Sequence, residues 1–201
     1  MQNAPAAAAP VSQPDYFSLF GLKRRFGVDR QALERKFYEL SKSMHPDRFT
    51  MASPEAMRES LVRMSELNDA YSTLKSPESL REYYLKLEGL DSSTERQSGA
   101  AGGAGGPIPM ELAESWFELQ DAVMEDPKAA AGKVAEFEGQ LADLRKQGAE
   151  GMTGLECEID STADAHGSAP RELLERLSRE IRAQSYLKSM ERDVERIKAR
   201  L

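Results

Sequence analysis

A glycine-rich run near the middle of the chain divides it into two parts that cannot share one continuous core. The segment from Gly99 to Gly106 reads Gly-Ala-Ala-Gly-Gly-Ala-Gly-Gly and follows a Ser/Thr stretch. Such a segment has almost no side chains to pack and loses much backbone entropy on ordering. We therefore expect residues 91–107 to form a flexible linker between two domains, 15–90 and 108–201.

Helical spacing of apolar residues dominates the first part, and no stretch alternates as a strand would. Asp29 is a suitable N-cap for a helix that Pro46 ends, and Ser53-Pro54 and Ser76-Pro77 have the pattern that begins two further helices. The apolar stripe of the helix before Pro46 consists of Leu33, Phe37, Leu40 and Met44. The first part is therefore predicted to contain two long helices that turn at Pro46.

The second part is predicted to be a bundle of three helices, which makes the whole chain all-α. Apolar residues repeat at intervals of three and four in each helix: Leu112, Trp116, Leu119 and Val123; Val134, Phe137, Leu141 and Leu144; and Leu187, Met190, Val194, Ile197 and Leu201. Residues 148–169 are rich in Gly, Ser, Thr and Asp, which predicts a polar loop between the second and third helices.

Composition excludes several classes of protein. The 201 residues include 27 Lys and Arg against 34 Asp and Glu, and this net charge of -7 argues against a nucleic-acid-binding surface. The single cysteine, Cys157, cannot form an intramolecular disulfide or a multi-thiolate zinc site. No apolar run approaches the roughly 20 residues that cross a membrane. Residues 1–14 are rich in Ala, Pro and Gln without basic residues, so we expect a disordered leader and an intracellular protein.

The tripeptide His45-Pro46-Asp47 is the candidate functional motif, because it falls in the predicted turn between two long helices. Proline restricts the backbone, so the imidazole and the carboxylate would project from a rigid turn toward a partner. The alternative is that both side chains only satisfy backbone groups of a tight turn. A tripeptide alone does not decide between these readings.

The sequence around the motif favours the functional interpretation. It includes Asp15-Tyr16-Phe17-Ser18-Leu19-Phe20-Gly21-Leu22, Leu40, His45-Pro46-Asp47-Arg48-Phe49, Leu67-Asn68-Asp69-Ala70-Tyr71-Ser72-Thr73-Leu74 and Ser76-Pro77. Through these residues the span 15–90 resembles the J-domain of DnaJ-type co-chaperones. Within that superfamily the chain is most similar to HscB-type co-chaperones of iron-sulfur cluster assembly, which carry a helical bundle directly after the J-domain.

The J-domain resemblance implies an antiparallel helical hairpin that docks onto a DnaK/HscA-class heat-shock chaperone and accelerates its ATP hydrolysis. The protein would then be no enzyme itself and would need no cofactor. The chaperone-binding residues would be His45, Pro46, Asp47, Arg35, Lys36, Lys42 and Arg48, of which Arg35, Lys36 and Lys42 precede the motif on one helix. The alternative for these basic residues is an ordinary solvated helix surface.

The HscB resemblance also implies that the first helix of the bundle binds an IscU-type iron-sulfur scaffold protein. Its segment Glu118-Leu119-Gln120-Asp121 resembles the Glu-Leu-x-Glu segment of that family. The expected client-binding residues are Met110, Ala113, Glu114, Trp116, Phe117, Gln120, Asp121 and Met124. Phe117 would be the apolar anchor, but a slip of one residue in the alignment would put Trp116 in that place.

Two other function classes remain open from the sequence: a J-domain co-chaperone with a different client, and a helical adaptor or dimerisation protein. A nucleophilic triad is not expected, since His45 and His166 are the only histidines. Cys157 and the acidic residues near His166 do not have the spacing of a standard metal site, so we expect no metal. The absent transit peptide favours a bacterial cytoplasm, with no nucleic-acid or membrane partner.

Overall fold

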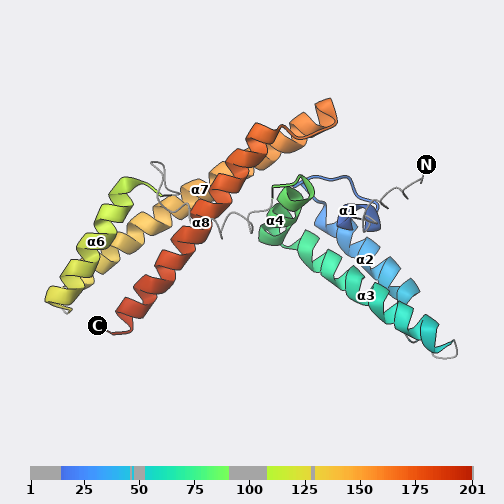
Figure 1. Ribbon diagram of the computed structural model, residues 1–201, viewed down its shortest axis with the longest axis horizontal. Coiled ribbons are helices and arrows are strands. Elements are labelled where there is room, and N and C mark those ends of the chain that lie inside the picture. The colour runs from blue at the N-terminus through green and yellow to red at the C-terminus, as the bar shows by residue number, and fades with distance from the viewer. Residues whose placement is uncertain (1–14, 46, 48–52, 91–107, 128–129, 201) are drawn as a thin grey trace, which may run out of the picture. The chain divides into compact units, whose positions relative to one another are not determined.

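The computed structural model (Figure 1) describes most of the chain, namely residues 15–45, 47, 53–90, 108–127 and 130–200. All regular elements within these ranges are α-helices, which confirms the expected all-α fold class. The predicted leader and the predicted linker both lie outside these ranges. The chain divides into two compact units, Met1–Tyr84 and Leu85–Leu201, and each is described by itself.

The first unit is built on two long helices that pack against each other (Figure 1). Its helices are α1 (Tyr16–Leu19), α2 (Arg30–Met44), α3 (Pro54–Lys75) and α4 (Pro77–Leu87), the last of which continues past the unit boundary. The caps are those that the sequence predicts: the Asp29 carboxylate accepts the backbone N–H groups of Gln31 and Ala32, and the Ser53 hydroxyl accepts that of Ala56.

The core between α2 and α3 fixes how the turn between them is presented. Leu33 of α2 and Leu67 of α3 are fully buried, and the rings of Phe37 and Tyr71 stack with centroids 4.2 Å apart. Phe17 of the short helix α1 is also fully buried. These contacts make α2 and α3 one rigid hairpin, because a packed core tolerates little movement of its helices.

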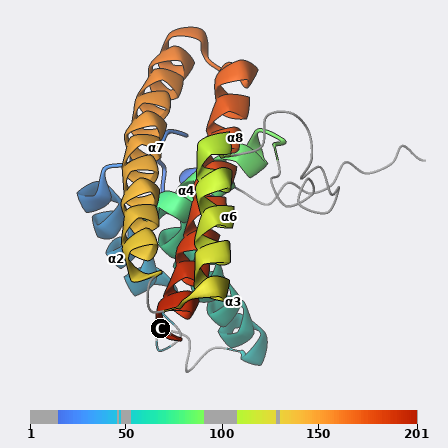
Figure 2. The ribbon, with the colours of Figure 1, turned by 90° about the vertical axis from the view of Figure 1, so that its left-hand side faces the viewer.

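The second unit contains three long helices around one core. Figure 2 shows α6 (Met110–Glu125), α7 (Ala131–His166) and α8 (Arg171–Lys198) side by side. Their shared core consists of Leu112, Leu119, Val134, Phe137, Leu141, Leu187, Met190 and Val194. All of these side chains come from the three apolar stripes that the sequence predicts. Leu201, the last residue of the third stripe, lies outside the described ranges. Figure 1 shows that α6 covers only the first part of α7, and that the α7–α8 hairpin continues beyond it.

The predicted polar loop at residues 148–169 is wrong. Helix α7 runs without interruption for 36 residues and ends only at His166. Gly167 then adopts the left-handed conformation, at φ 78°, and its N–H bonds to the Ala163 carbonyl at 2.8 Å. The helix persists because this stretch has a buried face of its own, formed by Gly148, Met152, Ile159 and Asp160, along α8. Tertiary packing thus overrides the low helix propensity of its glycines.

Membrane insertion finds no support in the helices that the structure describes. None of them combines the length and the hydropathy that a membrane-spanning helix requires.

Candidate functional site

The candidate motif lies at the end of α2, where the backbone leaves the helix. His45 directly follows Met44 and is extended, with φ -61° and ψ 131°. The side chains of His45 and Asp47 are 51% and 84% exposed, so neither supports the core. Pro46 and Arg48 lie outside the described residues.

An imidazole and a carboxylate lie next to each other at this position. The backbone N–H of Asp47 donates to Nδ1 of His45 at 3.3 Å, and the Asp47 carboxylate oxygen Oδ2 lies 3.5 Å from the same nitrogen. A neutral imidazole that accepts at Nδ1 carries its proton on Nε2, which leaves Nε2 as a donor for a partner. Both groups suit recognition of a partner. Accepting the Asp47 N–H uses only one of the two ring nitrogens of His45.

A buried serine on α3 connects the two long helices next to this motif. The hydroxyl of Ser60 donates to the backbone carbonyl of Met44 at 2.6 Å, and Ser60 is only 4% exposed. Sequence reasoning missed this residue. The available signal was the spacing of seven between Ser60 and the core residue Leu67, which places a polar side chain on the buried face of α3.

The basic residues of α2 that precede the motif are exposed on the helix surface. Arg35, Lys36 and Lys42 all lie on the surface, and Nζ of Lys36 is 3.3 Å from the Glu39 carboxylate. Tyr38 is an exposed aromatic, three residues after Arg35 and four before Lys42, which makes it their neighbour on the helix surface. The face therefore combines cations with an aromatic ring that the sequence did not single out.

In the second unit, α6 places its two adjacent aromatic residues in different environments. Trp116 packs against the core, where its ring is 5.3 Å from that of Phe137. Phe117 is 65% exposed. The structure thus distinguishes the two candidate anchors that the sequence left open, and it places Phe117 at the surface.

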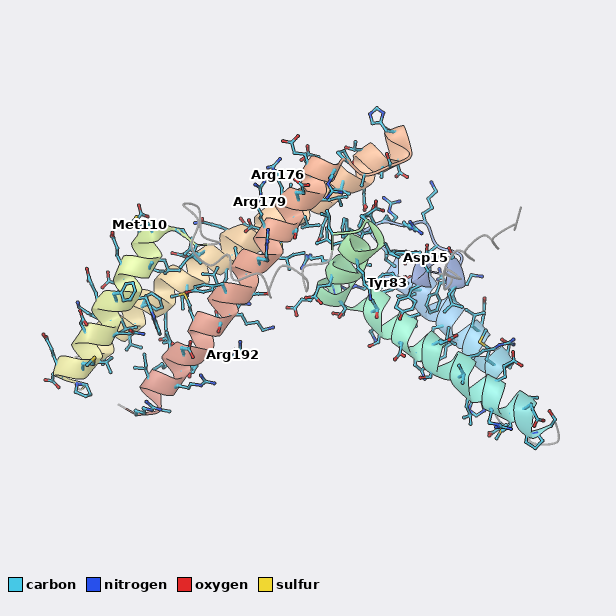
Figure 3. All side chains as sticks on the ribbon, viewed as in Figure 1. Asp15, Tyr83, Met110, Arg176, Arg179 and Arg192 are labelled. Carbon is cyan, nitrogen blue, oxygen red and sulfur yellow. The ribbon has the colours of Figure 1, made fainter. Side chains whose placement is uncertain are left out.

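Three exposed apolar side chains form a line along α6, and we call Met110, Phe117 and Met124 the α6 stripe. Met110 and Met124 are 78% and 84% exposed, and both are seven residues from Phe117, so the three share one face. Figure 3 labels Met110, which begins the helix. Large apolar side chains gathered on one face of a soluble protein usually mark a binding surface.

Charge on α6 is confined to acids, and these lie on one side of the stripe. Helical spacing places Glu114 and Asp121 on one side of Phe117, and the uncharged Ala113 and Gln120 on the other. The helix contains no Lys or Arg. A partner that fits this surface would present an apolar patch with basic groups along one edge.

Cys157, His166 and the acidic residues between them lie along α7 and do not form a cluster. Cys157 is exposed, and His166 is the last residue of the helix. Among the residues that the structure describes, no three His, Cys, Asp or Glu side chains are grouped in a way that could hold a metal ion.

Asp15, the first residue of the quoted Asp-Tyr-Phe segment, has a structural role. Its carboxylate accepts the Ser18 N–H at 2.7 Å, which caps α1, and pairs with the Arg24 guanidinium. Burial raises the pKa of Asp15, but the hydrogen bonds from Ser18 and Arg24 outweigh it and hold the pKa below its ordinary value. Nearby, the Tyr83 hydroxyl accepts the N–H of Tyr16 at 2.8 Å, and Figure 3 labels Asp15 and Tyr83.

Known proteins resemble this chain over most of its length, although no protein-family model matches it. The protein named co-chaperone protein HscB homolog from Bordetella petrii is 34% identical over 177 residues, which cover 86% of this chain and 97% of that protein. The protein of the same name from Azoarcus sp. is 34% identical over 157 residues, which cover 78% of this chain and 83% of that protein.

Solved structures of HscB proteins also resemble this chain. Chaperone HscB from Vibrio cholerae is 25% identical, with a TM-score of 0.55, over 93% of this chain and 99% of that one. Human co-chaperone protein HscB is 22% identical, with a TM-score of 0.57, over 96% of this chain and 86% of that one. At that identity the human protein shows a common fold alone.

Proposed function

Because the chain belongs to the HscB family of co-chaperones, we propose that it works as a J-domain co-chaperone in iron-sulfur cluster assembly. Its first unit stimulates ATP hydrolysis by a DnaK/HscA-class heat-shock chaperone. Its second unit delivers an IscU-type scaffold protein to that chaperone. The observation that carries the proposal is the exposed pair of His45 and Asp47 at the end of α2, in a chain of this family.

The chaperone side of this function requires recognition and no chemistry of the chain's own. The exposed Asp47 carboxylate would pair with a cation of the chaperone, and His45 offers a donor beside it. Arg35 and Lys42 on α2 extend the same surface with positive charge, which favours encounter with an acidic surface. Hydrolysis takes place in the nucleotide site of the partner, whose conformation the docked hairpin would bias.

The client side is supported by the exposed apolar residues of the α6 stripe and the acids beside it. The stripe offers three side chains that the core of the second unit does not use. Glu114 and Asp121 would pair with basic groups on the scaffold and set the direction in which it docks.

The chaperone activity is tested by measuring ATP hydrolysis of a DnaK/HscA-class chaperone with wild-type chain, His45→Gln and Asp47→Asn. Both variants should lose stimulation and change unfolding by less than about 0.5 kcal/mol, because exposed side chains contribute little to stability. Asp69→Asn, an isosteric change at an exposed position of α3, is the matched control and should stimulate normally. Full stimulation by folded Asp47→Asn protein would refute this part of the proposal.

The client site is tested by titrating an IscU-type scaffold onto the chain. Phe117→Ala should weaken binding by at least about 1 kcal/mol, as a modest hot spot does, and leave unfolding nearly unchanged. Tyr186→Ala removes an exposed aromatic from α8 of the same unit and is the matched control. If the wild-type chain stimulates the chaperone but does not bind the scaffold, the protein is a J-domain co-chaperone for another client.

A further inference from the structure

Ser60 occupies an unusual position for a hydroxyl group. It lies on the buried face of α3, and only 4% of it is exposed. A hydroxyl in such a place is costly unless it is hydrogen-bonded. The Ser60 hydroxyl donates to the backbone carbonyl of Met44, at 2.6 Å and 16 positions away in the sequence. The serine therefore connects α3 to the last residue of α2.

This bond acts on the peptide group that leads into the candidate motif. The last four carbonyls of an α-helix have no partner within the helix, and Met44 is the final residue of α2. Its carbonyl belongs to the same planar peptide as the nitrogen of His45. Holding the carbonyl oxygen therefore fixes the plane from which His45 departs, at the point where the backbone becomes extended.

We propose that Ser60 is a positioning residue for His45 and Asp47, which keeps the pair in the orientation that the chaperone recognises. This inference rests on the proposed chaperone-stimulating function. Without the hydroxyl, the Met44 carbonyl loses its donor from α3, and the peptide can rotate. The fraction of molecules with the correct orientation then falls, and the apparent affinity for the chaperone falls with it. The net contribution of one hydrogen bond limits this change to at most about five-fold.

The experiment compares Ser60→Ala with Ser65→Ala, which removes an exposed hydroxyl from the same helix. Chaperone ATPase is measured over a range of co-chaperone concentrations, and backbone NMR order parameters are measured for His45 and Asp47. Ser60→Ala should raise the half-maximal concentration by up to about five-fold, keep the maximal stimulation, and lower both order parameters. Ser60→Cys, of similar size but with a weaker donor, should fall between Ser60→Ala and the wild type. Ser65→Ala should match the wild type.

Two results would overturn the inference. The first is a folded Ser60→Ala protein with wild-type half-maximal concentration and wild-type order parameters, even if it melts at lower temperature, since that is a purely structural role. The second is a loss of order spread over all of α2 and α3 and not concentrated at the motif. If Ser60→Ala does not fold, Ser60→Cys carries the same comparison. If the wild-type chain does not stimulate the chaperone, the proposed function fails, and the order parameters still decide whether Ser60 positions the pair.

Discussion

Replacing glycines of α7 by alanine should stabilise the second unit at some positions and not at others. Gly151 and Gly154 lie on the exposed side of the helix, and a Cβ added to either would meet no other group within 4 Å. Glycine in a helix interior costs about 0.8 kcal/mol relative to alanine. We therefore expect Gly151→Ala and Gly154→Ala each to raise the free energy of unfolding by about that amount.

Gly148→Ala is the matched comparison, because the same gain in helix propensity is opposed by a close approach between helices. A Cβ there would lie 2.7 Å from Oε1 of Glu180 and would overlap the amide of Gln184, both on α8. The overlapping atoms are at the ends of flexible side chains, so they can move at modest cost. The net effect should be near zero, whereas Gly148→Leu should lose about 2 kcal/mol or more through overpacking.

Urea unfolding followed by tryptophan fluorescence measures the stability of the second unit, where these glycines lie. Trp116 is the only tryptophan, and it contacts Phe137 in the core of the second unit. With a slope of about 2 kcal/mol per molar urea, a gain of about 0.8 kcal/mol moves the midpoint up by about 0.4 M. A lower midpoint for Gly151→Ala and Gly154→Ala would refute a continuous α7. An equal gain for Gly148→Ala would refute the close approach of α7 and α8.

Three further predictions concern the two units separately. Reversing Arg35 and Lys42 to Glu should slow association with the chaperone and flatten its salt dependence, because exposed charges act mainly on the encounter rate. Stopped-flow kinetics at several salt concentrations would measure this rate, and an unchanged rate at low salt would contradict the prediction. Asp15→Ala should cost about 1 kcal/mol at pH 7 through loss of the α1 cap. Because the folded pKa of Asp15 lies below its ordinary value of 3.8, the charged group stabilises the fold above that pH, and thermal melts should show the difference from wild type shrinking as pH falls through the folded pKa. Trp116→Ala should lower the free energy of unfolding of the second unit by about 2 kcal/mol, measured by circular dichroism, whereas Phe117→Ala should change it by less than about 0.5 kcal/mol. Equal losses would contradict the opposite placement of the two rings.

Local chemistry was enough to predict most of the helices. A side-chain oxygen that caps a helix acts within three residues of its own position, so Asp29 and Ser53 mark helix starts without knowledge of the rest of the chain. Apolar spacing likewise identifies the inner faces of α6 and of the first half of α7, because the period of a helix is a property of the backbone. The position of His45 and Asp47 at a helix end followed from Pro46, which cannot continue a helix.

Three features depended on residues far apart in the sequence. Helix α7 continues beyond Gly148 because α8 packs along it, and the glycines that predicted a loop there are tolerated or needed in that contact. Apolar spacing predicts that Trp116 faces inward, but the choice of anchor between the adjacent Trp116 and Phe117 stayed open until the contact with Phe137 of α7 showed which ring is buried. The bond from Ser60 to Met44 exists because two helices meet. Such contacts arise where two helices pack together, and a short stretch of sequence does not show which distant residues it will contact.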